Sequence, residues 1–403
     1  MISCHRSTAL LLIFLELEQY QGPYQETVLK ASKSELGSSD IKYSVMFPTP
    51  VLRHCIGVDV SKDSLSICSC KLGPDLVKTF DFGEDVGNDR TGFDNLLDWI
   101  RGQTDTVPPV ILMEATGVYH EGLAHYLFSC GIELCIMQSG RVKRYAQSLD
   151  QRSKTDMLDS KMLSMLGCER LLKPWSPPSE NLVQLKGLCR ERAALVRERT
   201  LEKNRLHALK IGSHQNKRTL SRHKKRLKMF EEQIAEVVQE MHALINADDR
   251  LSGQLGNLIS IPGVSFVALA TVVGETLGFS DIANVKQLAS FAGYDVVLRE
   301  SSNFRGRTRI SKKGNKHIRA VLHMPSMAVI GFNPTLGPFY QRLKAKKEKP
   351  IVGLIATQRK LLLLMYALWK KEEFYDPDIL KNKAAGPKEP SAQDSNLKYQ
   401  LTS

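Results

Sequence analysis

The sequence predicts an α/β domain followed by a mainly helical region, and three observations favour this fold class. Up to about residue 137, alternating or wholly apolar runs of strand length are separated by turn residues and by two stretches with helical spacing. Between about 182 and 245 the composition is strongly helical and basic. Beyond 251, helical periodicity continues to about 371. The 403 residues leave room for two or three domains, each with its own core.

Five segments are expected from the changes in composition. They are an extension over 1–50, an α/β domain over 51–175, a basic arm over 176–250, a C-terminal domain over 251–375 and a polar tail over 376–403 that we expect to be disordered. A start codon placed too far upstream, or an appended segment, would explain the extension. Its apolar run 9–15 is followed at once by Glu16 and Glu18, where a signal peptide would have small residues.

The first domain is expected to contain three strands, a helix, a strand, a helix, a strand and a helix. A hairpin of two strands with a third strand is predicted over 55–60, 65–70 and 76–82. The later elements are predicted over 92–101 (helix), 110–113 (strand), 119–130 (helix) and 132–137 (strand). The continuous hydrophobicity of 110–113 indicates a strand buried on both faces.

The stretch 152–166 predicts a helix with two carboxylates on one side. Asp156 and Asp159 stand three residues apart and are therefore neighbours. They lie beside an apolar stripe formed by Leu158, Met162, Met165 and Leu166. Gly167 is expected to end the helix. Two like charges in a first turn repel each other unless a cation lies between them, so this is either a metal site or a solvated acidic helix start.

Two further carboxylates fall at strand ends. Asp59 ends the first predicted strand and Glu114 follows the buried strand 110–113. Taken singly, each is an ordinary turn residue. Because functional groups of such sheets collect at the carboxyl ends of the central strands, we expect both to meet Asp156 and Asp159 at one edge. Four carboxylates there would require Mg²⁺ or Mn²⁺, and two such ions about 4 Å apart can activate and stabilise the oxygens of a phosphodiester.

Charge and cysteine content narrow the choice of partner and compartment. The net charge is +13, which points to a polyanionic partner, with nucleic acid as the first candidate and an acidic membrane surface as the second. The apolar runs nearest to membrane-helix length, 9–15 and 361–369, are too short. The eight cysteines lie mostly in apolar runs without a CxxC pair, so we expect reduced core residues of a cytoplasmic protein, with neither zinc nor disulfides.

The helical arm and the segment after it carry most of the candidate nucleic-acid contacts. Gly212 and Ser213 interrupt the arm, which predicts two long helices in a hairpin or coiled coil, either contacting phosphates or serving only as a solvated structural pair. Helices predicted at 255–259 and 266–277 flank the turn 261–264, where Gly263 would present backbone amides to DNA, although any helical hairpin could use such a turn.

Residues 300–319 alternate cations with hydroxyl groups. The segment follows a helix predicted at 285–292 and an extended stretch at 296–299, and precedes further helices, the last at 350–371. Ser301 and Ser302 are candidate nucleophiles. Cations that could stabilise a phosphoryl transition state or bind nucleic acid are Arg305, Arg307, Arg309, Lys312 and Lys313. The alternative is a solvated charge run.

Six short motifs give the sequence its resemblance to a known family. They lie, in order, at 57–62, 113–119, 154–159, 261–264, 288–293 and 311–314. In this order and content the chain resembles the transposases of the bacterial IS-one-ten and IS-eleven-eleven insertion sequences over about residues 56–375. The resemblance implies an RNase H-like (Holliday-junction-resolvase-like) domain with a DEDD tetrad, a coiled-coil arm, and a C-terminal transposase domain with a helix-hairpin-helix-like segment and a nucleophilic serine.

The resemblance also implies roles for individual residues and partners. The tetrad falls on Asp59, Glu114, Asp156 and Asp159, with Mg²⁺ as its cofactor, and the serine falls on Ser301. One residue fewer separates this serine from Arg305 than in the family pattern, so Ser302 stays an alternative. Implied partners are DNA at the element ends and target, a noncoding bridge RNA that pairs with both, and further copies of the chain in a dimer or tetramer.

Two other functions stay open from the sequence. A metal-dependent, junction-resolving endonuclease would use the carboxylates alone, with water as the nucleophile. A catalytically silent nucleic-acid-binding derivative would keep only the basic surfaces. A sugar-kinase or actin-like fold is disfavoured because Val60 stands where its phosphate loop needs glycine.

Overall fold

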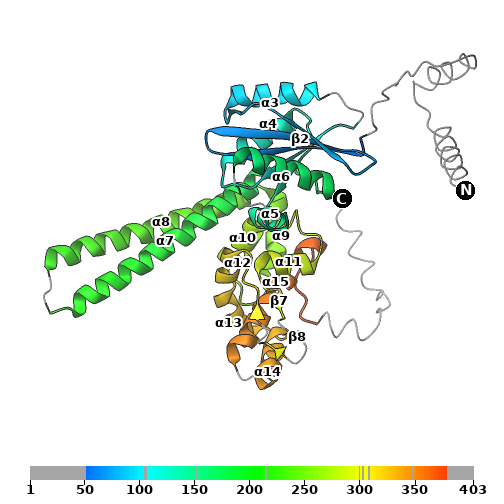
Figure 1. Cartoon of the computed structure of the whole chain (residues 1–403). Helices are drawn as coiled ribbons and strands as arrows, with labels where there is room; N and C mark the ends of the chain where they lie inside the picture. Colours follow the sequence, from blue (N-terminus) through cyan, green and yellow to red (C-terminus); the bar gives the residue numbers. More distant parts are fainter. Residues whose placement is uncertain are drawn as a thin grey trace, which may run out of the picture. The chain divides into compact units, whose positions relative to one another are not determined.

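The computed structural model describes two compact units, one ending at Trp175 and the other beginning at Ser176. We call them the sheet unit and the helical unit (Figure 1). The described residues are 51–103, 107–149, 153, 155–213, 216–298, 300–301, 304–306, 309–346 and 349–378. The predicted extension 1–50 lies outside them, as does nearly all of the predicted tail.

The sheet unit is built on a mixed sheet with the strand order β3-β2-β1-β5-β6, in which β4 also pairs with β2. The strands are β1 (Arg53–Val60), β2 (Ser64–Leu72), β3 (Lys78–Phe82), β4 (Val86–Gly87), β5 (Val110–Glu114) and β6 (Leu134–Met137). β1 is antiparallel to β2 and parallel to β5, and β5 is parallel to β6. The predicted hairpin, third strand and two later strands are confirmed.

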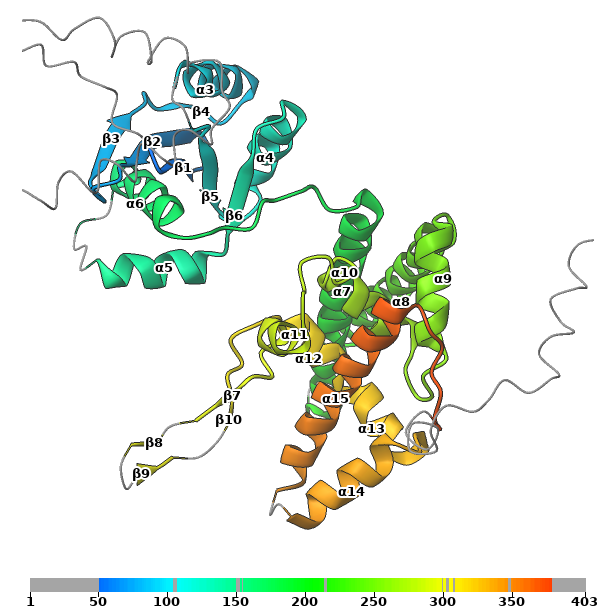
Figure 2. The same ribbon diagram turned by 90° about the vertical axis from the view of Figure 1, so that its right-hand side faces the viewer.

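Helices cover both faces of this sheet, as Figure 2 shows. They are α3 (Arg90–Gly102), α4 (Tyr119–Ser129), α5 (Ser139–Ser148) and α6 (Asp156–Glu169). Buried residues of α3 and α4 such as Leu96 and Leu123 share one apolar core with Ile56 and Val58 of β1. Leu163 of α6 packs into a second core, on the opposite face, with Cys55. The unit therefore has three layers, with β1 and β5 at the centre of the sheet.

The helix predicted at 152–166 differs from α6 at both ends. It begins at Asp156, because the Thr155 hydroxyl caps it by accepting a hydrogen bond from the amide of Leu158 at 3.2 Å. The prediction that Gly167 ends it was wrong, since α6 continues to Glu169. Gly167 instead makes room for the sheet, because a Cβ there would lie 2.0 Å from Sγ of Cys55.

Two elements of the sheet unit were not predicted. α5 carries mostly polar residues and buries only Val142, so it has too few apolar residues for hydrophobic patterning to indicate a helix. β4 has only two residues. The prediction that the cysteines are core residues is confirmed for six of the seven described ones, and Cys130 is half-buried.

The helical unit begins with two long helices, α7 (Glu180–Ile211) and α8 (Lys217–Asn246), which run side by side as a hairpin (Figure 1). We call this hairpin the arm. The shorter helices are α9 (Asp249–Ile259), α10 (Phe266–Glu275), α11 (Val285–Ala292), α12 (Lys316–Val321), α13 (His323–Phe332), α14 (Leu336–Lys346) and α15 (Pro350–Lys371). The mainly helical character predicted for this region is confirmed, although α13 and α14 were not assigned from sequence.

α15 is the central helix of this unit. By length and composition alone it could cross a membrane, whereas the sequence prediction considered only its apolar run 361–369, which is too short to do so. Its residues Leu361, Leu362 and Met365 are fully buried and share one core with Leu269 of α10 and Leu288 of α11. Burial against neighbouring helices is what a core helix of this composition requires.

A β-ribbon projects from the helices of this unit between α11 and α12 (Figure 2). Its base is formed by β7 (Val296–Val297) paired with β10 (Arg309–Ile310), and its outer part by β8 (Glu300–Ser301) paired with β9 (Phe304–Arg305). We call β7–β10 the ribbon. The extended stretch predicted at 296–299 agrees with β7.

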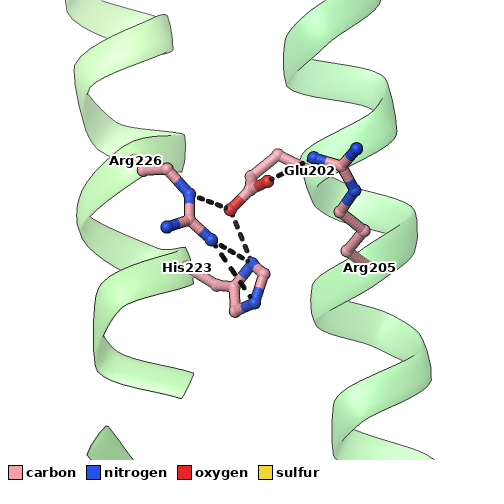
Figure 3. A network of polar contacts seen from close by, with 4 residues as sticks. All are labelled: Glu202, Arg205, His223 and Arg226. Carbon is pink, nitrogen blue, oxygen red and sulfur yellow. Dashed lines mark hydrogen bonds and ion pairs between the residues drawn. The ribbon is translucent and has the colours of Figure 1, made fainter. Parts of the chain in front are cut away.

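A buried carboxylate links the two helices of the arm (Figure 3). The side chain of Glu202 is 2% exposed, and its Oε1 lies 2.6 Å from Nδ1 of His223 and 2.7 Å from Nε of Arg226, both on α8. Nη1 of Arg205 reaches its other oxygen at 3.4 Å. Burial alone would raise the pKa of Glu202, but the hydrogen bonds from Arg226 and His223 hold this pKa below its usual value.

Replacing Glu202 by Ala should therefore lower the free energy of unfolding by about 3 kcal/mol, since it leaves cations of α8 without their buried partner. The stabilisation by Glu202 should be fully present above its unfolded-state pKa of about 4.3 and be lost as the pH falls through the lower folded-state value. Urea unfolding between pH 3 and 7 would measure both effects. Glu236→Ala, at an exposed position of α8, is the control and should change stability by less than about 0.5 kcal/mol.

Candidate functional site

Asp59 and Glu114 lie at neighbouring strand ends. β1 and β5 are parallel, and Val58 pairs with Met113, so the next residue of each strand is one of these two acids. Side chains alternate between the faces of a strand. Cys55 of β1 and Leu112 of β5 both belong to the core under α6. Every second residue of a strand faces the same side, and Asp59 and Glu114 lie an even number of residues after Cys55 and Leu112. Asp59 and Glu114 therefore both belong to the α6 face at the carboxyl edge.

α6 crosses β1 unusually closely at Gly57. A Cβ on Gly57 would lie 2.2 Å from the carbonyl oxygen of Ser160 and 2.4 Å from the backbone nitrogen of Ser164. Further along α6, Gly167 meets Cys55. The helix and the strand are therefore antiparallel, and the amino-terminal end of α6 points to the edge where β1 ends.

The spacing along both elements brings Asp156 above Asp59. From the crossing point, four residues of helix back to Asp156 span about 6 Å, and two residues of strand on to Asp59 span about 6.6 Å. Asp156 also belongs to the helix stripe that contains buried Ser160 and Ser164. The backbone therefore gathers three of the four predicted acids at one edge, with Asp159 one turn further along α6.

The electrostatics of this edge are mixed. Asp156 and Asp159 lie in the first turn of α6, where the helix dipole favours negative charge. Asp156 is exposed, and the other three acids are half-buried. Within the described part of the chain, which omits 150–152 and 154, no three His, Cys, Asp or Glu side chains lie close enough to hold a metal ion. The DEDD site thus stays a prediction, supported by backbone placement and donor chemistry.

Asn88 is a residue of this edge that the sequence analysis missed. Its Nδ2 donates to the carbonyl of Ser61 at 2.8 Å and to that of Tyr119 at 3.2 Å. It therefore ties the turn after β1 to the start of α4, on either side of the candidate acids. An asparagine after a glycine predicts only a turn, so the sequence offered no signal for this long-range role.

Ser301 lies near the outer end of the ribbon. It ends β8, pairs with Phe304 of β9, and its side chain is exposed. Ser302 and Arg307 are outside the described residues, and Arg305 is described only as part of the β9 backbone. Exposed cations close the segment at Arg309, Lys312 and Lys313. A serine presented on a projecting ribbon is accessible to a large substrate, but its predicted role is untested by this geometry.

The predicted turn between the first two helices after the arm is present. Gly263 has φ +84°, a conformation that favours glycine, between α9 and α10. One side of it packs on α13, since a Cβ would lie 3.3 Å from the backbone nitrogen of Val329. Nucleic-acid binding by this turn stays a prediction.

Two family models and two curated relatives match the chain. Residues 56–209 match a model described as a transposase, of the DEDD and IS110 type, and residues 256–341 match the transposase IS116/IS110/IS902 family. The pilin gene-inverting protein of Moraxella lacunata is 29% identical over 330 residues, and that of Moraxella bovis is 29% identical over 327 residues. Each match covers 80% of this chain and 98% of the relative. The chain belongs to the IS110 transposase family.

Family membership confirms the resemblance found in the sequence motifs and gives the transposase its general activity. Transposases of this family recombine DNA, so DNA is a partner of this transposase. The first match includes all four predicted acids and runs into α7, and the second ends within α14. Ser301 and the cations of the ribbon fall inside the second match.

The close crossing at Gly57 can be tested by adding one methyl group. Gly57→Ala should lower the free energy of unfolding by about 2 kcal/mol, because α6 must move away from β1. Gly140→Ala is the matched control, since a Cβ at this helical position of α5 meets nothing within 4 Å. It should be neutral or stabilise by up to about 1 kcal/mol. Urea denaturation of both variants measures the difference, and equal stabilities would contradict the crossing.

Proposed function

We propose that this transposase cuts and rejoins DNA with Ser301 as the nucleophile and with Mg²⁺ held by Asp59, Glu114, Asp156 and Asp159. The observation that carries the proposal is the parallel register of β1 and β5, which puts Asp59 and Glu114 at neighbouring positions near the carboxyl ends of the two strands, on the face covered by the amino-terminal turn of α6. Such an edge is where α/β sheets place their functional groups.

The chemistry of the acids fits a hard divalent cation. All four offer carboxylate oxygens, the ligands preferred by Mg²⁺ and Mn²⁺. The backbone placement of Asp59, Glu114 and Asp156 at one edge of the sheet supports a shared ion, with Asp159 one turn further along α6. The sheet topology supports an RNase H-like assignment: three antiparallel strands are followed by two strands parallel to β1, with helices on both faces.

The proposed reaction is a pair of phosphoryl transfers. Oγ of Ser301 attacks the scissile phosphorus and forms a phosphoserine diester, while the bond from phosphorus to one DNA oxygen breaks. The electron pair leaves with that oxygen, which takes up the proton lost by Ser301 by way of solvent. A hydroxyl from the second DNA strand end then attacks the diester, restores Ser301 and joins the strands. When bound, Mg²⁺ would polarise the phosphate.

Nearby cations would support this transfer. Arg305, Arg307 and Arg309 lie within eight residues of Ser301 in the chain, and guanidinium groups stabilise charge on a phosphoryl transition state. Lys312 and Lys313 are exposed beyond the base of the ribbon, where they could bind the DNA backbone. The relatives are named for inverting a pilin gene, and inversion likewise requires cutting and rejoining of DNA.

We also infer that the arm binds nucleic acid and that a noncoding guide RNA is one of its ligands. The first twelve residues of α8 carry seven Lys and Arg residues and no acid, whereas all four glutamates of α8 lie after residue 230. This separation of cations from acids is what binding to a phosphate backbone requires, whereas a helix pair that only neutralises its own charges would mix the two. Action on two DNA sites at once favours a homo-oligomer, a dimer or a tetramer.

Ser301→Ala should abolish both strand exchange and the covalent protein-DNA adduct, since no oxygen remains to attack phosphorus. Incubation with labelled DNA and Mg²⁺, followed by denaturing electrophoresis, detects the adduct. Ser302→Ala is the matched control and should form the adduct normally. Full activity of Ser301→Ala with loss in Ser302→Ala would transfer the role to the second serine.

The same assay separates the two alternatives. A junction-resolving endonuclease would give cleaved products that are never rejoined, and it would be indifferent to Ser301→Ala. A silent derivative would give neither product while still binding DNA. Asp59→Asn and Asp156→Asn should remove Mg²⁺-dependent activity in both enzyme mechanisms, because each removes a charged ligand.

The arm can be tested through the salt dependence of binding. Replacing Arg222, Lys224, Lys225 and Lys228 by Gln should reduce the slope of log K against log salt by about 0.9 for each duplex phosphate that the arm no longer neutralises. Filter binding of DNA and RNA at several salt concentrations measures the slope. The control replaces four exposed lysines elsewhere in the helical unit: Lys344, Lys346, Lys370 and Lys371. An equal reduction in the control would mean that net charge alone is responsible.

A further inference from the structure

A second buried carboxylate lies between α7 of the arm and Asn315, the residue that precedes α12. Glu275 is the last residue of α10 and is only 2% exposed. The carboxyl end of a helix carries partial negative charge, so an acid there is disfavoured by its own helix. An acid that is both buried and at this helix end must be stabilised by partners from other elements.

Those partners come from two directions. Nε and Nη2 of Arg190, on α7, donate to the two carboxylate oxygens of Glu275 at 2.7 and 3.0 Å. Nδ2 of Asn315 donates to Oε2 at 2.6 Å. Burial alone would raise the pKa of Glu275, but these hydrogen bonds hold this pKa below its usual value, and the same pairing raises the pKa of Arg190. Glu275 is therefore ionised in the folded chain at neutral pH.

Asn315 connects Glu275 to the ribbon. Its Oδ1 accepts from the amides of His317 and Ile318, which caps α12, and its own amide donates to the carbonyl of Phe291 in α11 at 2.7 Å. The neighbouring Gly314 lies against α11 so closely that a Cβ would meet the carbonyl oxygen of Phe291 at 2.5 Å. α11 and α12 are thus fixed to each other at the two points where the ribbon leaves them.

The two segments of the chain that follow α11 and precede α12 come together at the ribbon base. The amide of Ser311 donates to the carbonyl of Asp295 at 2.9 Å, and the hydroxyl of Ser311 donates to the carboxylate of Asp295. The ladder of β7 and β10 follows directly. Directional polar contacts therefore run from Arg190 through Glu275 and Asn315 to α11, and further polar contacts join the two chain segments that lead from α11 and α12 to the ribbon base.

We propose that Glu275 is a positioning residue, which fixes the direction of the ribbon that carries Ser301 relative to α7 of the arm. The proposal rests on the function proposed for Ser301. A buried ion pair contributes little net stability compared with apolar packing, but it specifies one geometry, because hydrogen bonds from a guanidinium are directional. Here the specified geometry is the angle between α7, which is proposed to bind nucleic acid, and the ribbon, which is proposed to carry the nucleophile.

The direct test measures a distance in the intact protein. Spin labels at Ala193→Cys, exposed on α7, and Val296→Cys, 54% exposed on the ribbon, report the angle through a distance distribution by double electron-electron resonance. The background carries Cys4→Ser and Cys130→Ser. The distribution should be narrow with Glu275 and broad in Glu275→Gln, which loses the ion pair and brings a side-chain amide against the amide of Asn315.

Two variants separate positioning from folding. Asn315→Asp keeps a good cap for α12 but replaces the donor to Glu275 by a second carboxylate, so it should also broaden the distribution. Combining Glu275→Gln with Asn315→Asp restores a hydrogen bond with donor and acceptor exchanged, and should narrow it again. Glu202→Gln is the matched control, since this equally buried acid links α7 to α8 only, and it should leave the distribution unchanged.

Activity provides the second readout. The rate of adduct formation should fall in Glu275→Gln on the order of 10- to 100-fold, the effect of misplacing a reacting group by about 1 Å, while DNA affinity stays unchanged. A distribution that remains narrow in both single variants overturns the positioning role. If Ser301→Ala stays active while the distribution broadens in Glu275→Gln, the positioning role stands and the function proposed for Ser301 fails.

Discussion

The close crossing of α6 over β1 is the constraint on which the sheet unit depends. Gly57 and Gly167 allow the helix backbone to approach the strand to a distance that a methyl group would prevent at either point. Both glycines are needed, because two contact points fix the direction of the helix as well as its distance from the sheet. This direction brings the first turn of α6 to the carboxyl edge of the sheet. Without it, the aspartates of α6 would be separate from the acids of β1 and β5.

Most of the architecture followed from hydrophobic patterning. The strands around Val58 and Met113 and the helices α3, α11 and α15 were predicted to within a few residues, because their apolar residues recur at a clear period or, around Met113, form an unbroken run. α5 escaped detection since it buries a single valine. Gly167 was misread because a glycine that ends a helix and one that admits a neighbouring strand look identical until the partner Cys55 is known.

The candidate site was foreseeable in part. Strand ends and helical spacing singled out the four acids, and parallel pairing of β1 with β5 supplied the reason why two of them are neighbours. The contacts of Asn88 and Glu275 were beyond prediction, since each depends on residues distant in the chain, such as Tyr119 and Arg190. Local patterns report periodicity and turns, whereas such contacts arise only after the elements have packed.

The uneven charge along α8 has a consequence for how a long ligand would approach. Cations crowd the half next to the turn of the arm, and glutamates occupy the half next to α9. The helix is therefore electrically polar along its length, unlike a uniformly basic rod. A polyanion drawn in by this field would be attracted most strongly to the half of α8 next to the turn of the arm, which orients it before any specific contact forms.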